Sequence, residues 1–315
     1  MASTRAPVTQ DAWRPWALRV LLALGLLALL PALPVWTPLQ RLEHDLLASW
    51  TAAPPPDAGV LVVGLDEPSL AALNLTPPLP RRLHAQLVQA LSAAGALALG
   101  IDMLFAAPQS PADDAALAAA LQGRMPVVLA AADVAVNTSQ VAQYRQTVPS
   151  VFPMARQGSV AVQPDDDGVL RLAPAGSDAL WQELARSGGR SFQPPPPGAL
   201  LRYYAPEVSL PYAHYTQALE AGQALPAAAV QGRLVLLGQN TPVDGVDQFA
   251  TPLRALGAGT QSGVLVHATA LVNGLVGDWV VPAHPAGPWL QAALAVGCVA
   301  AWTDRKSTRL NSSHT

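Results

Sequence analysis

Apolar residues fall into two long uncharged runs that enclose a region of shorter alternating segments. The first run, residues 20–36, contains seventeen residues without a charge, close to the minimum for a helix that crosses a hydrocarbon core about 30 Å thick. The second, residues 288–303, looks like the first part of a similar helix. The stretch between them, residues 40–285, has the mixed composition of a folded domain. This pattern predicts a globular domain flanked by two membrane segments.

Charge around the first run predicts its orientation. Three arginines and one aspartate precede it, and the positive-inside rule places such a segment, residues 1–19, in the cytoplasm. A cleavable signal peptide is the alternative, but no small-x-small site follows the run, and tryptophans flank it as interfacial anchors do. We expect an uncleaved anchor in the inner (cell) membrane, with the domain on the periplasmic or extracellular side.

The middle region begins with a β-α-β pattern. "GVLVVGLDE" (59–67) is a continuous apolar run that ends in carboxylates, as in strands buried on both faces of a parallel sheet. Residues 80–95 then carry leucines at helical spacing and stop at a glycine. "ALALGIDMLF" (96–105) repeats the strand pattern, again followed by an aspartate. A proline-rich spacer, "TAAPPPDAG", separates this unit from a short amphipathic stretch next to the first apolar run.

The alternation continues to the end of the region. Ser110 and Pro111 predict a helix start, and that helix should run to Gly123. Further strands are predicted at 125–131 and 232–240, and a closing helix at 263–276, whereas residues 133–200 give no clear pattern. Strands that alternate with helices predict an α/β fold with a mostly parallel sheet flanked by helices.

Composition narrows the classes of function. The net charge of -3 offers no basic stripe for nucleic acid. The only cysteine, Cys298, lies in the second apolar run, which excludes an intrachain disulfide and a soluble thiol nucleophile. Motifs for α/β-hydrolases, P-loops, dinucleotide sites and zinc peptidases are missing. "PDDDGVLR" fails as a calcium loop, because Pro174 stands where a glutamate is required, and predicts a tight turn at Asp167 and Gly168. We expect no enzyme, cofactor or metal.

Candidate binding residues follow the predicted strands. Asp66 and Asp102 should lie at neighbouring carboxyl ends of parallel strands, where α/β folds bind ligands. Such a pair could orient a polar ligand, bind a cation, or act as acid and base; alternatively, each aspartate could cap the next helix or pair with Arg81 or Arg82. The predicted ligand-binding residues are Asp66, Arg81, Asp102, Asp247 and His267.

Two of these residues lie after the fourth strand. Asp247 falls in the loop that follows it, in "GVDQFATPL". His267 shares a predicted helical face with Leu271 and Leu275, so we expect a semi-buried core residue. A hydrogen bond to Asp247 or Asp102 would make His267 pH-sensitive.

An ordered set of motifs resembles a known family. "VLVVGLDEPSLAAL", "PLPRRLHAQLVQALSAAGALALGIDMLF", "DDAALAAAL", "DDDGVLR", "GRLVLLGQNTPVDGVDQFATPL" and "GVLVHATALVNGLV" resemble the second type of CHASE domain, the cyclase and histidine-kinase associated sensory extracellular domain. The resemblance implies a sensor of an unknown extracytoplasmic signal, a homodimer, and a membrane receptor that ends in a cyclase, histidine kinase or serine/threonine kinase. Residues 40–285 would be the sensor.

The end of the chain contradicts a complete second span. Residues 304–314, "DRKSTRLNSSH", resemble the conceptual translation of a common sequencing adapter. We expect residues 304–315 to be an artefact that interrupts the second membrane helix and removes the effector; a genuine basic cytoplasmic tail is the alternative. Besides the sensor, two functions stay open: a membrane-anchored periplasmic enzyme that uses Asp66 and Asp102, and a dimerisation module without a ligand.

Overall fold

The computed structural model of the chain describes the central domain and little of the flanking segments. Described are residues 20–22, 25, 29, 33–136, 144–148, 151–174, 176–205, 210–241, 247–257, 260–282 and 297. One compact unit is Asp45–Val281, and Met1–His44 with Pro282–Thr315 forms another. Within the described segments, no helix has the length and apolarity to cross a membrane. The predicted spans at 20–36 and 288–303 lie largely outside those segments.

A seven-stranded, mostly parallel sheet forms the centre of the Asp45–Val281 unit. Its order is β4-β3-β2-β7-β1-β6, and β5 pairs with β3 off this path. All neighbours are parallel except β3 and β4. The strands are β1 (Val60–Leu65), β2 (Ala98–Asp102), β3 (Val127–Val136), β4 (Tyr144–Val148), β5 (Arg156–Ser159), β6 (Tyr212–His214) and β7 (Leu234–Gln239). A separate antiparallel pair consists of β8 (Gln248–Ala250) and β9 (Thr260–Ser262).

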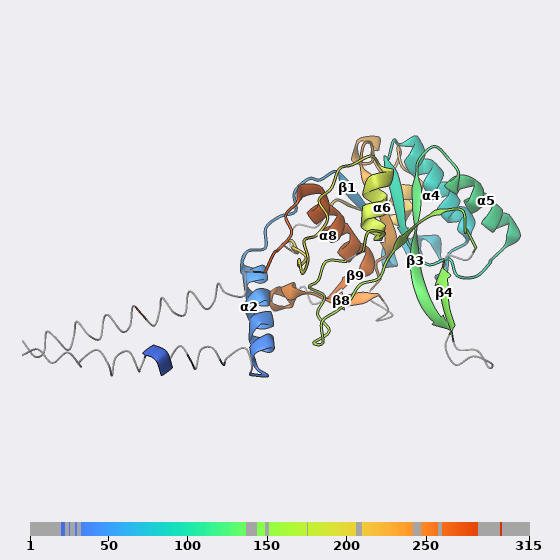
Figure 1. The fold of residues 1–315 in the computed structure, drawn as a ribbon. Coiled ribbons are helices and arrows are strands. Elements are labelled where there is room, and N and C mark those ends of the chain that lie inside the picture. Colours follow the sequence, from blue (N-terminus) through green and yellow to red (C-terminus); the bar gives the residue numbers. More distant parts are fainter. Residues whose placement is uncertain are drawn as a thin grey trace, which may run out of the picture. The chain divides into compact units, whose positions relative to one another are not determined.

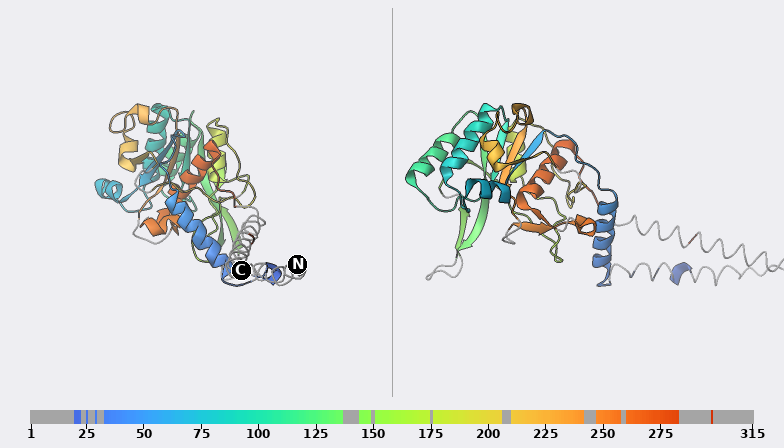
Figure 2. Two further views of the ribbon diagram at one scale, coloured as in Figure 1. Left: turned by 90° about the vertical axis from the view of Figure 1, so that its left-hand side faces the viewer. Right: turned by 180° about the vertical axis from the view of Figure 1, so that it is seen from behind.

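Helices cover both faces of the sheet (Figures 1 and 2). One face packs against α3 (Glu67–Leu73), α4 (Arg81–Ala93), α5 (Pro111–Leu121) and α7 (Tyr215–Leu219). The other packs against α6 (Leu180–Ser187) and α8 (Gly263–Val276). Three further helical segments are α2 (Trp36–Trp50), η2 (Ala227–Ala229) and η3 (Pro252–Leu256). The sheet therefore lies between two apolar cores.

Local sequence explains the best-defined elements. Every residue of β1 is buried, because its apolar side chains alternate between the two cores. α4 is followed by Gly95, which has a φ of +86° that favours glycine. Gly274 of α8 lets the Trp181 ring of α6 approach, since a Cβ there would lie 2.3 Å from the ring. Trp181 is fully buried and joins the two helices of its face.

The sequence predicted most of this scaffold. The strands at 59–67, 96–105 and 232–240 and the helices at 80–95, 110–123 and 263–276 are confirmed as β1, β2, β7, α4, α5 and α8. The strand predicted at 125–131 extends further, as β3, and turns back into β4. Residues 133–200, which gave no pattern, also contain β5 and α6. The tight turn in "PDDDGVLR" is confirmed, with Gly168 at a φ of +76° and its amide donating to the Asp165 carbonyl.

Candidate functional site

The chain leaves the central strands toward opposite faces. After β1 and β2 it continues into the helices of one face, whereas after β7 it leads to α8 on the other face. Because β7 lies between β1 and β2, this divergence opens a crevice at their carboxyl ends. A crevice at such a switch point is where open α/β sheets bind ligands.

A pocket of about 590 Å³ occupies this crevice, within the size range of small-molecule sites. The ends of all three strands contribute to it, through Leu65, Asp102 and Gln239. Most of the remaining wall is apolar. The other lining residues are Pro77, Pro78, Leu79, Arg81, His84, Met103, Leu104, Phe105, Ala106, Ala107, Pro108, Gln109 and Asp247. We call this cavity the strand-end pocket.

Asp102 presents a carboxyl group without a local partner. It ends β2, and its Oδ2 is buried with no hydrogen-bond partner among the described residues. Burial in this surrounding raises the pKa of Asp102 to about 7, because desolvation disfavours the charged form. Neither Arg81 nor Arg82 forms an ion pair with Asp102, since they pair instead with Asp114 and Asp113 of α5.

Asp247, just before β8, brings a second carboxyl group into the pocket next to the start of α8. Its carboxylate lies against Gly263, where a Cβ would be 2.3 Å from Oδ1, and its backbone carbonyl accepts the Gly263 amide. Burial and the charge of Asp102 raise the pKa of Asp247 to about 6, against the opposing effect of His267. The charge of Asp102 therefore disfavours the ionised form of Asp247.

His267 is a core residue behind this wall. It is 2% exposed, more buried than expected, and does not line the pocket. Its ring hydrogen-bonds the backbone of Val160, and its Nδ1 has no partner among the described residues, so the suggested bond to Asp247 or Asp102 is not found there. Burial lowers the pKa of His267 to about 4, although the charge of Asp247 acts the other way. The imidazole is neutral at physiological pH.

Arg81 and His84 form the α4 side of the pocket. Arg81 is 3% exposed; its Nη1 donates to Asp114 at 2.5 Å and its Nη2 to the Ala107 carbonyl, while its Nε has no partner among the described residues. His84 Nδ1 lies 3.0 Å from the Tyr215 hydroxyl. Burial, with a contribution from Arg81, lowers the pKa of His84 to about 4. His84 was not predicted, because its only signal in the sequence is one polar residue on a buried helical face.

Asp66 does not take part in the pocket. The expectation that Asp66 and Asp102 end neighbouring strands is wrong, because β7 is inserted between β1 and β2. Asp66 instead accepts the Ser69 amide and caps α3, which is the structural role considered as the alternative. Its Oδ2 also lies 2.8 Å from the Tyr212 hydroxyl and 2.5 Å from His214 Nδ1. Burial opposes its charge, but these hydrogen bonds outweigh burial and lower the pKa of Asp66.

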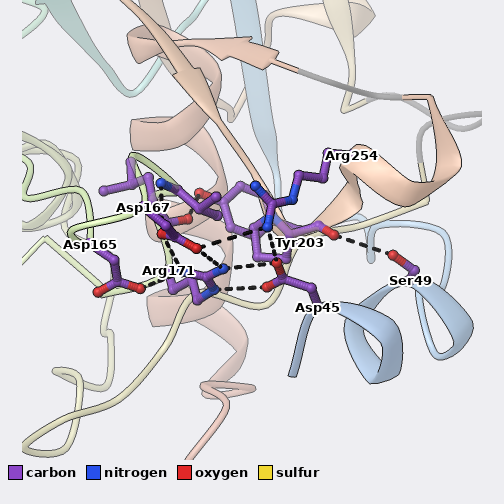
Figure 3. A network of polar contacts seen from close by, with 10 residues as sticks. Asp45, Ser49, Asp165, Asp167, Arg171, Tyr203 and Arg254 are labelled. Atoms are coloured by element: carbon purple, nitrogen blue, oxygen red, sulfur yellow. Dashed lines mark hydrogen bonds and ion pairs between the residues drawn. The ribbon is translucent and has the colours of Figure 1, made fainter. Parts of the chain in front are cut away.

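A buried ion cluster lies elsewhere in the domain, around Arg171 (Figure 3). Arg171 donates to both carboxylate oxygens of Asp45, in α2, at 2.8 Å. It also donates to Asp165 and Asp167 of the tight turn at 2.6 and 2.9 Å, and Arg254 approaches Asp45 at 3.3 Å. Burial opposes the charge of Arg171, but the three carboxylates outweigh it and raise its pKa. We call these five residues the Arg171 cluster; it fixes the last part of α2 to the domain.

Residues 200–205 connect the two chain ends of the domain. The Ala205 amide donates to the carbonyl of Ala53, just after α2, at 2.9 Å. Leu200 and Val280, just after α8, exchange backbone hydrogen bonds of 2.8 and 3.1 Å. Between them, the Arg202 amide donates to the buried side chain of Asn273 in α8. We call residues 200–205 the linking segment.

Comparison with known proteins gives one match. A family model, described as the CHASE2 domain, matches residues 20–303. No curated protein matches the chain, and no solved structure does. Domains of this family are sensory extracellular domains of signalling receptors in membranes. The match covers nearly the whole sequence and contains the domain with its sheet, strand-end pocket and Arg171 cluster, so this chain belongs to the CHASE2 domain family.

Proposed function

We propose that residues 45–281 are the extracytoplasmic ligand-sensing domain of a transmembrane receptor, and that its ligand binds in the strand-end pocket. The observation that carries this proposal is the pocket itself, at the point where the chain diverges between the two faces of the sheet. Its apolar walls with a few convergent polar groups are typical of small-molecule sites. The sensor is anchored in the inner membrane by residues 20–36.

The connectivity of α8 supports a route for the signal. Ligand binding shifts a conformational equilibrium only if it contacts elements that differ between the two states. Asp247, in the pocket wall, lies against Gly263 at the start of α8. The other end of α8 leads through Val280 to the second apolar run, and the linking segment hydrogen-bonds both Val280 and the chain after α2. A shift of α8 would therefore act on both chain ends.

In this proposal the effector follows the second apolar run, as in receptors of this family. It would be a cyclase, a histidine kinase or a serine/threonine kinase, and the receptor would act as a homodimer. The enzymatic alternative has little support, because the two aspartates it requires are separated by β7 and one of them caps a helix. No group of three or more metal-ligating side chains occurs in the described part of the chain.

Reporter fusions test the topology. Alkaline phosphatase fused after residue 282 of the full chain should be active, whereas green fluorescent protein at the same point should be dark, because each reporter works on one side of the membrane only. Fluorescence without phosphatase activity would refute an extracytoplasmic sensor. Sequencing the gene beyond residue 303 should then reveal a kinase or cyclase.

A thermal-shift screen tests the pocket. A library of small molecules is screened against the purified full chain and against Ala106→Trp, which places a large ring at the pocket wall. Compounds that raise the melting temperature of the wild type should lose their effect in the variant. Hits that stabilise both proteins equally would show that ligands bind elsewhere.

A further inference from the structure

We infer that the strand-end pocket recognises a small organic cation, whose ammonium group lies between the carboxylates of Asp102 and Asp247 and whose apolar part contacts the proline-rich wall. This inference rests on the proposed function and specifies its ligand class. It follows from which polar groups of the pocket are already satisfied and which are not.

The positive groups of the pocket are already engaged. Arg81 uses both terminal nitrogens, on the Asp114 carboxylate and the Ala107 carbonyl, and its guanidinium lies 5.3 Å from the Phe105 ring centroid. Only its Nε is left for a ligand acceptor. His84 is held by Tyr215 and is neutral at physiological pH. An anionic ligand would therefore find no free cation in the described wall.

The two carboxyl groups of the pocket, in contrast, are not balanced by a basic side chain of the described residues. Asp102 has a buried oxygen without a partner among the described residues, and Asp247 adds a second carboxyl group to the lining of the same pocket. Neither forms an ion pair with a described basic side chain. Burial raises the pKa of both groups, and the charge of Asp102 adds to this for Asp247, whereas an adjacent cation would favour the ionised forms. A ligand ammonium supplies that charge together with up to three hydrogen-bond donors.

Ligand geometry favours an organic cation over a metal ion. Two carboxylates are too few for a protein calcium site, which takes six to eight oxygen ligands, and the described residues contain no cluster of three metal-ligating groups. Beside the carboxylates, Pro77, Pro78 and Leu79 provide an apolar surface. Burial of a hydrocarbon body against this surface lowers the free energy of binding, whereas a bare ion has no apolar area to bury.

Matched probes on the full chain test the ligand class. Thermal shift and calorimetry at pH 8 compare butylammonium and phenethylammonium with their alcohols, 1-butanol and 2-phenylethanol, and with the anions valerate and 3-phenylpropionate. We expect the ammonium compounds alone to raise the melting temperature. Asp102→Asn and Asp247→Asn should each weaken their binding at least tenfold, because each removes one charge-assisted hydrogen bond. Affinity should fall at pH 5, where protons compete for both carboxylates.

Asp57→Asn is the matched control. It removes an aspartate that is 69% exposed and paired with Arg233 just before β1, at the other end of that strand. Binding should be unchanged in this variant. Stabilisation by the alcohols or the anions instead of the ammonium compounds would overturn the ligand class and leave a ligand-sensing pocket intact. Stabilisation by calcium or magnesium alone, or by none of these probes, would also overturn it. The topology experiment fails or succeeds independently of all these outcomes.

Discussion

Removal of the Arg171 side chain should destabilise the domain more than any other single change in its ion pairs. Arg171 is 3% exposed at its side chain and makes five hydrogen bonds to carboxylates. Arg171→Met keeps the length and apolar volume but removes every donor. Asp45, whose side chain is 5% exposed, then loses both of its 2.8 Å bonds.

The magnitude follows from the charge left behind. Breaking a buried pair by removing one partner costs about 3–5 kcal/mol, because the remaining charge is buried without compensation. Arg254 stays 3.3 Å from Asp45, and Asp165 and Asp167 are more exposed than Asp45, so part of the charge is still balanced. We therefore expect the lower end, a loss of about 3 kcal/mol. With a urea m value of about 3 kcal/mol/M for a domain of this size, the midpoint should fall by about 1 M.

Pulse proteolysis of the detergent-solubilised full chain across a urea series measures this midpoint. Arg254→Met is the first control, because its side chain is 47% exposed and it should cost less than about 1 kcal/mol. Arg186→Met, at an exposed pair with Glu183, is the second, with the same expectation. A midpoint for Arg171→Met within 0.3 M of the wild type, a threshold of about 1 kcal/mol, or equal to that of Arg254→Met, would show that the cluster does not stabilise the domain in this way.

Three further substitutions test other contacts. Asp66→Asn keeps an oxygen that can cap α3 but loses the carboxylate that faces Tyr212 and His214, so it should cost about 1–2 kcal/mol at pH 7. Since the folded pKa is lowered, this stability is present above pH ~4 and lost below it, so urea midpoints of variant and wild type should converge at low pH. Asp102→Asn should raise the melting temperature at pH 8 and not at pH 4. The pKa of Asp102 is about 7 in the folded state against 3.8 for a free side chain, so its ionisation destabilises the folded state as the pH rises, by at most about 4 kcal/mol. Equal shifts in melting temperature at both pH values would contradict this. Gly274→Ala should lower the urea midpoint, since a clash of about 1–3 kcal/mol with Trp181 outweighs the gain in helix propensity of about 1 kcal/mol; a stabilised variant would refute the close packing.

Periodicity explains why most of the scaffold was predictable. β1 and β7 are apolar over their whole length because both faces are covered, and α8 is apolar with a glycine at each end. Shorter elements have too few residues to show a recognisable pattern of apolar positions. β6 has only three residues and follows residues 206–209, which lie outside the described segments. α6 has no side-chain cap, and its apolar residues can be recognised as a buried helical face only once the core that they fill is known.

Strand order could not be predicted, because it depends on contacts between distant segments. β7 enters the sheet between β1 and β2, although more than a hundred residues separate it from either. The Arg171 cluster has the same origin: the aspartate-rich turn was recognisable in the sequence, but its partner Asp45 lies 126 residues from Arg171. Local patterns predicted the turn but gave no indication that its aspartates and Arg171 form a cluster with Asp45.

Asp66 and Asp102 show how one sequence pattern gives two chemical outcomes. Each aspartate follows a buried strand, yet the segments after them differ. The residues after Asp66 continue directly into α3, whose first amides need an acceptor, and β6 adds a tyrosine and a histidine beside it. Asp102 precedes a stretch without helix, residues 103–110, so no helix start requires its carboxylate. No basic side chain of the described segments pairs with it, and for that reason we place the ligand at Asp102 and not at Asp66.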